Sequence, residues 1–278
     1  MTSAATGKSS PYSSAWRAFA LFILVVVYAF NFIDRQIVGI LAVPIKAELG
    51  LSDTQLSLMG GLAFALFYTF LGIPIALLAD RVSRVWIMTA ALAAWSAMTA
   101  LCGFAQNFLQ LFLARLGVGV GEAGGVAPAY SLIADYFPPE KRARALAIYS
   151  LGIPVGSALG ILLGGVLTSI LDWRTAFISI GLAGLLFAPI FRLTMREPER
   201  GFFDGEAGAP AARRPARIGE VVSTLLSKPS FWGLSLGAAS SSMMGYGLIF
   251  WLPSFFVRSY GDALPGFFSW LPAALVPA

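Results

Sequence analysis

Histidine is absent from this sequence of 278 residues, and Cys102 is its only cysteine. These absences exclude a disulfide within the chain, a zinc site of cysteine and histidine ligands, and a nucleophile activated by histidine. No Gly-x-x-x-x-Gly-Lys-Ser/Thr segment is present, which disfavours ATP-driven activity. We therefore do not expect an enzyme, and the sequence predicts no cofactor and no metal site.

Charged residues are also scarce, at 12% of the chain, whereas 58% of the residues are apolar and the mean hydropathy is +0.78. A soluble domain could not bury that much apolar surface. A helix of about 17 to 25 apolar residues crosses the roughly 30 Å of hydrocarbon in a bilayer. The sequence therefore predicts an all-α, polytopic membrane helix bundle. Its seven candidate spans are residues 17–40, 55–79, 85–105, 108–134, 145–170, 173–193 and 231–257.

Lysine and arginine fall on alternate sides of these runs, which is how orientation is encoded in membrane proteins. The bias predicts a cytoplasmic N-terminus in a plasma or bacterial inner membrane, and it explains the net charge of +5 without a nucleic-acid partner. One side holds Lys8, Arg17, Arg81, Arg84, Lys141, Arg142, Arg144, Arg192, Arg196, Arg200, Arg213, Arg214, Arg217 and Lys228, and the other holds Lys46, Arg174 and Arg258.

The same pattern divides the chain into four parts. Residues 1–16 are predicted to form a cytoplasmic tail, and residues 17–193 a bundle of six transmembrane helices. Residues 194–230 are rich in charge, glycine, proline and alanine, which is typical of a solvated cytoplasmic linker. Residues 231–278 read as the truncated start of a second bundle, because the three prolines in 261–278 leave too little uninterrupted helix for an eighth span.

Four charged residues lie within the apolar runs away from their ends: Asp34 and Arg35 in the first, and Arg115 and Glu122 in the fourth. A charge near the bilayer centre is costly unless it faces a partner, water or the bundle interior. Arg115 and Glu122 are seven residues apart, about two helical turns, so they share one helix face. We expect this face to turn inward, toward Asp34 and Arg35.

Two interpretations of this charged set remain open. The four residues could form a buried ion network that only fixes helix packing, although such networks often add little net stability. Alternatively, a carboxylate that moves between a dry cavity and a neighbouring arginine can take up and release a proton. Since histidine is absent, Asp34 and Glu122 are then the candidates for the proton site.

Glycine recurs every fourth residue along the fifth run, at Gly152, Gly156, Gly160 and Gly164. Such a repeat forms a groove without side chains, in which another helix can pack or slide closely. The sequence does not distinguish static packing from sliding.

Three segments resemble the major facilitator superfamily. Asp80-Arg81-Val-Ser-Arg84 is similar to the signature Gly-x-x-x-Asp-Arg-x-x-Arg, with Ala76 in place of the glycine, and the stretches 115–121 and 135–144 resemble a second signature. Asn31-Phe-Ile-Asp34-Arg35, together with Gly121-Glu122-Ala, resembles the spinster-like branch. The resemblance covers about residues 17–260 and implies the N-terminal six-helix half of the fold plus the seventh helix.

The resemblance implies a carrier that works by alternating access, in which Asp34, Arg35, Arg115 and Glu122 line the cavity. It also implies that Asp80, Arg81 and Arg84 form a cytoplasmic gating loop. We thus expect a secondary active transporter, coupled to protons, for a small molecule. Seven aromatic residues in the last predicted span suit an amphipathic or lipid-like cargo, or only mark a membrane interface; they are Phe231, Trp232, Tyr246, Phe250, Trp251, Phe255 and Phe256.

The expected partners are the small-molecule substrate, protons and the lipid bilayer, but not nucleic acid. Because the superfamily has twelve helices, a closed cavity is expected to need the missing C-terminal half or a second copy of the chain. The alternative function is a membrane-embedded structural or regulatory partner without transport activity of its own.

Overall fold

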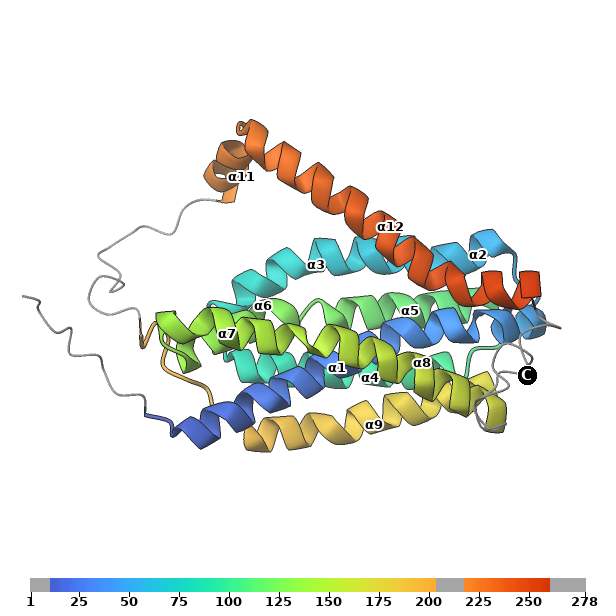
Figure 1. Ribbon diagram of the computed structural model, residues 1–278, viewed down its shortest axis with the longest axis horizontal. Coiled ribbons are helices and arrows are strands. Elements are labelled where there is room, and N and C mark those ends of the chain that lie inside the picture. Colours follow the sequence, from blue (N-terminus) through green and yellow to red (C-terminus); the bar gives the residue numbers. More distant parts are fainter. Residues whose placement is uncertain (1–10, 204–217, 261–278) are drawn as a thin grey trace, which may run out of the picture.

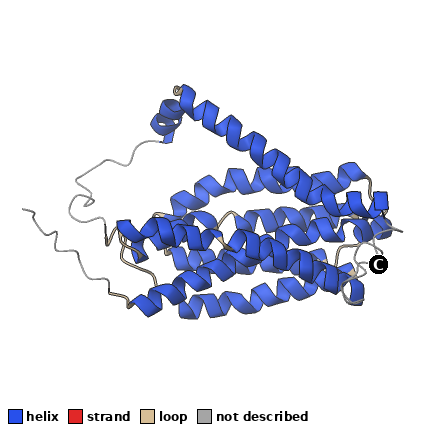
Figure 2. Ribbon diagram, in the orientation of Figure 1, coloured by secondary structure: helices blue, strands red, loops and turns tan. Residues whose placement is uncertain are grey.

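The computed structural model describes residues 11–203 and 218–260, which form helices and connecting turns, with no strand among them (Figure 2). The predicted region 261–278 lies outside the described residues. The helices are α1 (Ser14–Leu49), α2 (Asp53–Ser57), the π-helix η1 (Leu58–Leu62), α3 (Ala63–Ala79), α4 (Arg84–Cys102), α5 (Phe108–Glu122), α6 (Val126–Tyr136), α7 (Pro139–Ser150), α8 (Gly152–Ile170), α9 (Trp173–Thr194), α11 (Ile218–Leu226) and α12 (Pro229–Tyr260).

Most helices run lengthwise through one bundle (Figure 1). We call the end at residues 83, 138 and 195 the network end, and the end at residues 50, 103 and 171 the far end. Five described helical segments are long and apolar enough to cross a membrane: Ser14–Leu49, Asp53–Ala79, Arg84–Cys102, Pro139–Leu167 and Trp173–Thr194. They correspond to five of the seven predicted spans, and the predicted all-α membrane bundle is confirmed.

Helix α1 is longer than the predicted run of 17–40. Its first turn is capped by Ser13, whose hydroxyl accepts a hydrogen bond from the Trp16 amide at 3.1 Å. It ends at Gly50, whose φ of 62° is left-handed and therefore suits glycine. The helix thus extends over 36 residues and carries Asp34 and Arg35 near its middle.

The two predicted spans 108–134 and 145–170 differ from single helices. A turn separates α5 from α6 at residues 123–125, where Gly124 and Gly125 favour a break and Pro128 cannot donate a backbone hydrogen bond. A second break separates α7 from α8, just before Pro154. The remaining predicted span, 231–257, lies within α12, whose centre contains serine and glycine rather than apolar residues.

The glycine repeat of α8 faces α1. A β-carbon at Gly160 would lie 2.8 Å from Cβ of Gln36, and one at Gly164 would lie 3.2 Å from Ile40. A β-carbon at Gly152 would likewise lie 2.8 Å from Cβ of Tyr28. The missing side chains therefore let the two helices approach closely along the length that includes Asp34 and Arg35.

Helix α4 brings α5 and α9 together in the same way. A β-carbon at Gly121 of α5 would lie 2.6 Å from the backbone nitrogen of Trp95 in α4, and Trp95 itself is buried. Gly181 of α9 lies against Ala100 and Ser96 on α4. These close approaches turn the Glu122 face of α5 into the bundle.

Helix α12 crosses the bundle obliquely and lies near α2 and α1 with its C-terminal part (Figure 1). Phe250 packs against Gly39 of α1 and Gly60 of the π-helix. Arg258 also pairs with Asp53 at 2.7 Å. Helix α12 is therefore attached to the six-helix bundle toward the far end, while most of its side chains are exposed.

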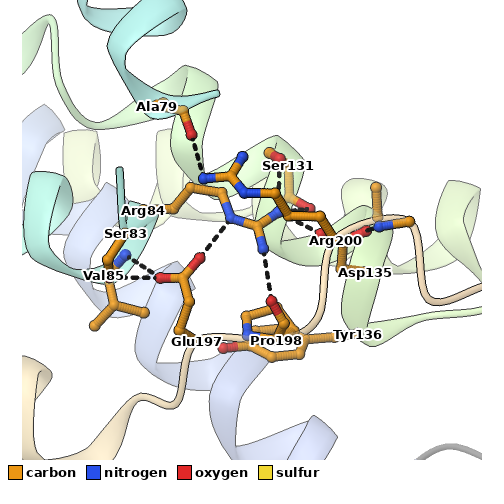
Figure 3. A network of polar contacts seen from close by, with 12 residues as sticks. Ala79, Ser83, Arg84, Val85, Ser131, Asp135, Tyr136, Glu197, Pro198 and Arg200 are labelled. Atoms are coloured by element: carbon orange, nitrogen blue, oxygen red, sulfur yellow. Dashed lines mark hydrogen bonds and ion pairs between the residues drawn. The ribbon is translucent and has the colours of Figure 1, made fainter. Parts of the chain in front are cut away.

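The chain after α9 folds back over the network end instead of leaving the bundle at once (Figure 3). Arg84, at the start of α4, forms ion pairs with Asp135 of α6 and with Glu197, the latter at 2.7 Å. Arg200 donates hydrogen bonds to the carbonyls of Ala79 and Val82, each at 2.7 Å. The segment predicted as a solvated linker, 194–230, thus begins with ordered contacts and also includes α11.

The carboxylate of Glu197 accepts hydrogen bonds from residues at the N-terminal end of α4. Burial raises the pKa of its carboxyl, but hydrogen bonds from the Val85 amide, the Arg84 guanidinium and the Ser83 hydroxyl outweigh burial and hold the pKa below its ordinary value. The charged form of Glu197 is therefore stabilised by the fold.

Replacing Gly160 with alanine is expected to lower the free energy of unfolding by about 1 to 3 kcal/mol, because the new methyl group would enter the contact with α1. Gly165, on the same helix, has open space around its Cα. Gly165→Ala should be neutral or stabilising, because alanine favours helix more than glycine does. Thermal unfolding in detergent compares the two, and equal effects would contradict the close packing.

Replacing Arg84 with glutamine should cost about 3 to 5 kcal/mol of stability, since Arg84 is 1% exposed and its loss would leave Asp135 and Glu197 without their shared cation. Arg81, three residues earlier, is exposed, and Arg81→Gln should change stability by less than about 0.5 kcal/mol. Unfolding followed by circular dichroism measures both, and a mild Arg84→Gln variant would contradict the structural role of the network.

The stabilisation from Glu197 should depend on pH. Because its folded pKa lies below the ordinary 4.5, its contribution is present above that value and disappears as the pH falls through the lower folded pKa. The difference in unfolding temperature between the wild type and Glu197→Gln should therefore be largest near neutral pH and shrink on acidification. A difference in unfolding temperature that grows on acidification would contradict this prediction.

Candidate functional site

The structure places the four predicted intramembrane charges inside the bundle. Asp34 lies on α1 and is 2% exposed, while Arg115 and Glu122 of α5 are 2% and 0% exposed. Arg35 lies next to Asp34, and 16% of its side chain is exposed. All four side chains are thus largely covered by the bundle.

The charges form two neighbouring pairs of opposite sign. The Nε atom of Arg35 donates to Oε2 of Glu122 at 2.8 Å, joining α1 to α5 across 87 residues of sequence. The Arg115 guanidinium lies close enough to Asp34 to interact with its carboxylate electrostatically. Opposite charges at this distance offset part of the cost of taking each one out of water.

One oxygen of each carboxylate has no hydrogen-bond partner among the described residues: Oδ1 of Asp34 and Oε1 of Glu122. Both oxygens are buried, so each lacks the stabilisation that water or a donor would give it. A proton on either oxygen would remove a buried charge.

Arg35 also contacts aromatic residues on the open side of the cluster. Its guanidinium carbon lies 5.0 Å from the ring centres of both Phe32 and Tyr68. Its Nη1 atom lies 3.4 Å from the hydroxyl of Tyr246 on α12. Arg35 thus contacts residues of both α3 and α12.

The predicted gating residues are not gathered into one cluster. Asp80 and Arg81 are exposed, whereas Arg84 is buried in the ion-pair network of the network end. Asp80 lines a hollow of about 510 Å³ between α3 and α6, which reaches Tyr68 at its other end. Tyr68, which lines this hollow, also contacts Arg35 of the charged cluster.

Sequence reasoning missed the roles of several polar neighbours. Tyr68 lies in an aromatic and apolar run with no charge to single it out. Thr99 interacts with Asp34, and Asn31 with Glu122, but neutral residues inside an apolar span give little signal of their partners. Within the part of the chain that the structure describes, no three His, Cys, Asp or Glu side chains lie close enough together to hold a metal ion.

Comparison with known proteins places this site in a family. The profile described as Major Facilitator Superfamily matches residues 24–278. An efflux pump of this superfamily from Mycolicibacterium smegmatis is 36% identical over 253 residues, which is 90% of this chain and 56% of the pump. Mouse protein spinster homolog 1 is 32% identical over 241 residues, which is 85% of this chain and 45% of that protein.

A crystal structure of a bacterial homolog to the human lysosomal transporter spinster, in an inward-facing and unoccupied conformation, is also similar. Its TM-score is 0.81 at 40% sequence identity, over 90% of this chain and 57% of that one. The chain spans about half the length of the relatives that it matches. The chain therefore belongs to the Major Facilitator Superfamily, and its sequence and helix arrangement are similar to the corresponding parts of spinster homologs.

Proposed function

We propose that this chain works in a proton-coupled secondary active transporter, which moves a small amphipathic or lipid-like molecule by alternating access. The observation that carries the proposal is the buried ion pair between Arg35 and Glu122 at 2.8 Å, with Asp34 and Arg115 beside it. A bundle that needed only tight packing would be as stable or more stable with apolar residues at these positions. A set of charges at membrane depth is therefore explained best by a function that uses them.

The proposed coupling uses competition for Arg35. When Glu122 is charged, its carboxylate holds the guanidinium. A proton on Glu122 removes that attraction and leaves Arg35 available to an anionic group of the substrate. Because Asp34 is the sequence neighbour of Arg35 and interacts electrostatically with both Arg35 and Arg115, its own protonation would shift the balance of charge around both arginines. Proton uptake and substrate binding would thus be linked through one side chain.

The surroundings of Arg35 support a cargo with a polar group and an apolar part. The guanidinium offers charged hydrogen bonds, while Phe32 and Tyr68 provide ring faces next to it. The relatives include proteins named as an efflux pump, a probable L-galactonate transporter and a spinster homolog. The aromatic rings beside Arg35 favour an amphipathic substrate over a purely polar one.

Alternating access also needs a gate and a second bundle. We propose that Asp80, Arg81 and Arg84 act at the cytoplasmic entrance, and that the network end with its many basic residues faces the cytoplasm. The cluster is open toward α3 and α12, so a closed cavity requires further helices, from a C-terminal half or from a second copy. The glycine face between α8 and α1 would let these helices shift against each other.

The test measures uptake in proteoliposomes under an imposed pH gradient, with a fluorescent lysophospholipid as the probe. Glu122→Gln and Asp34→Asn should each reduce gradient-driven uptake at least about tenfold, because neither amide can exchange a proton. Both are close to the size of the native residue, so binding of the probe should persist.

The matched control is Glu140→Gln, which removes an exposed carboxylate from α7. Its uptake should equal that of the wild type. If the wild type takes up the probe and all three variants do so at the same rate, the carboxylates are not the coupling groups. If the wild type does not bind the probe, the proposed substrate class is wrong.

A further inference from the structure

A second polar cavity lies away from the charged cluster, at the network end of the bundle. It has a volume of about 570 Å³ and is lined by the start of α4 and the end of α9. Arg192 and Arg196 contribute its positive charge, and Leu193 contributes apolar surface. Nothing in the transport mechanism proposed above uses this cavity.

The two arginines differ from the basic residues of the far end. Lys46, Arg174 and Arg258 each form an ion pair with an acidic side chain, at 2.7 to 2.8 Å. Arg192 and Arg196 form none with the described acidic residues, and Nε of Arg192 is buried without a hydrogen-bond partner there. Their positive charge is therefore available to an anion.

Glu197 also lines the cavity, but both of its oxygens accept hydrogen bonds from the network end. One of its oxygens accepts from Arg84 at 2.7 Å, and the other accepts from Ser83 at 2.7 Å and from the Val85 amide at 2.9 Å (Figure 3). The carboxylate is thus turned toward the ion-pair network. With two arginines and one carboxylate, the cavity lining carries a net positive charge.

The residues flanking the cavity place it at a membrane interface. Arg192 lies in the last turn of α9, and its guanidinium stacks over the ring of Trp86, 4.7 Å from the ring centre. Trp86 is 55% exposed, and Leu193 is 85% exposed. Tryptophan and arginine at the ends of spanning helices lie at headgroup depth, while exposed apolar side chains there contact acyl chains.

We propose that this cavity binds the headgroup of an anionic phospholipid, with the phosphate between Arg192 and Arg196 and an acyl chain along Trp86 and Leu193. Arginine pairs with phosphate through two parallel hydrogen bonds, which gives this interaction both strength and direction. A soluble anion would satisfy the charge but would leave the adjoining apolar surface unused. The site therefore selects a lipid over free phosphate.

Native mass spectrometry of the detergent-solubilised protein tests this proposal with phosphatidylglycerol, phosphatidylcholine and glycerol 3-phosphate as probes. Phosphatidylglycerol should bind most tightly. The double variant Arg192→Gln, Arg196→Gln should lose about tenfold or more of this affinity, because each basic residue at an anionic membrane surface contributes about one factor of five. The double variant Arg192→Lys, Arg196→Lys should retain more of this affinity than the glutamine variant. This comparison distinguishes a loss of charge from misfolding.

The control is the double variant Lys141→Gln, Arg144→Gln, which removes the same charge from exposed positions at the network end. It should bind phosphatidylglycerol as the wild type does. Equal loss in the control and the cavity variant, or equal binding of the anionic and the zwitterionic lipid, would overturn the proposal. Binding of glycerol 3-phosphate as tightly as the lipid would show an anion site instead. None of these results depends on transport, so this proposal and the proposed function can fail separately.

Discussion

The ion pair between Arg35 and Glu122 is the interaction on which the site depends. Taking both charges out of water costs free energy, and their attraction at 2.8 Å offsets that cost only while they remain together. A proton, a substrate anion or a helix movement that separates them therefore changes the energy of the whole cluster. This makes the pair a suitable place to link proton binding to a change of conformation.

The packing of the helices holds the pair in place. The glycines of α8 allow α1 to approach closely, and Gly121 allows α5 to approach Trp95 of α4. These contacts leave little room for Asp34 and Glu122 to turn away from the bundle. At the network end, Arg84 connects α4 to α6 and to the chain that follows α9. The site thus lies among helices attached to each other along their length and at one end.

Much of the fold could be predicted from the sequence, because apolar runs and intramembrane charges are strong signals. The inward face of Arg115 and Glu122 followed from their spacing on one helix. The breaks between α5 and α6 and between α7 and α8 were not predicted, since glycine and proline are common in membrane helices and do not always interrupt them. The contacts of Tyr68 and Tyr246 with Arg35 join segments that are far apart in the chain, and local sequence patterns do not indicate which distant residues meet.

Difference infrared spectroscopy of the protein in liposomes tests the central claim most directly, since it detects the protonation of individual buried carboxyl groups. On acidification, the account predicts a carbonyl band of a protonated carboxyl that disappears in Glu122→Gln or Asp34→Asn, and a larger band when an amphipathic anion occupies Arg35. A spectrum that is the same in the wild type and both variants would show that these carboxyls do not exchange protons, and would contradict the account.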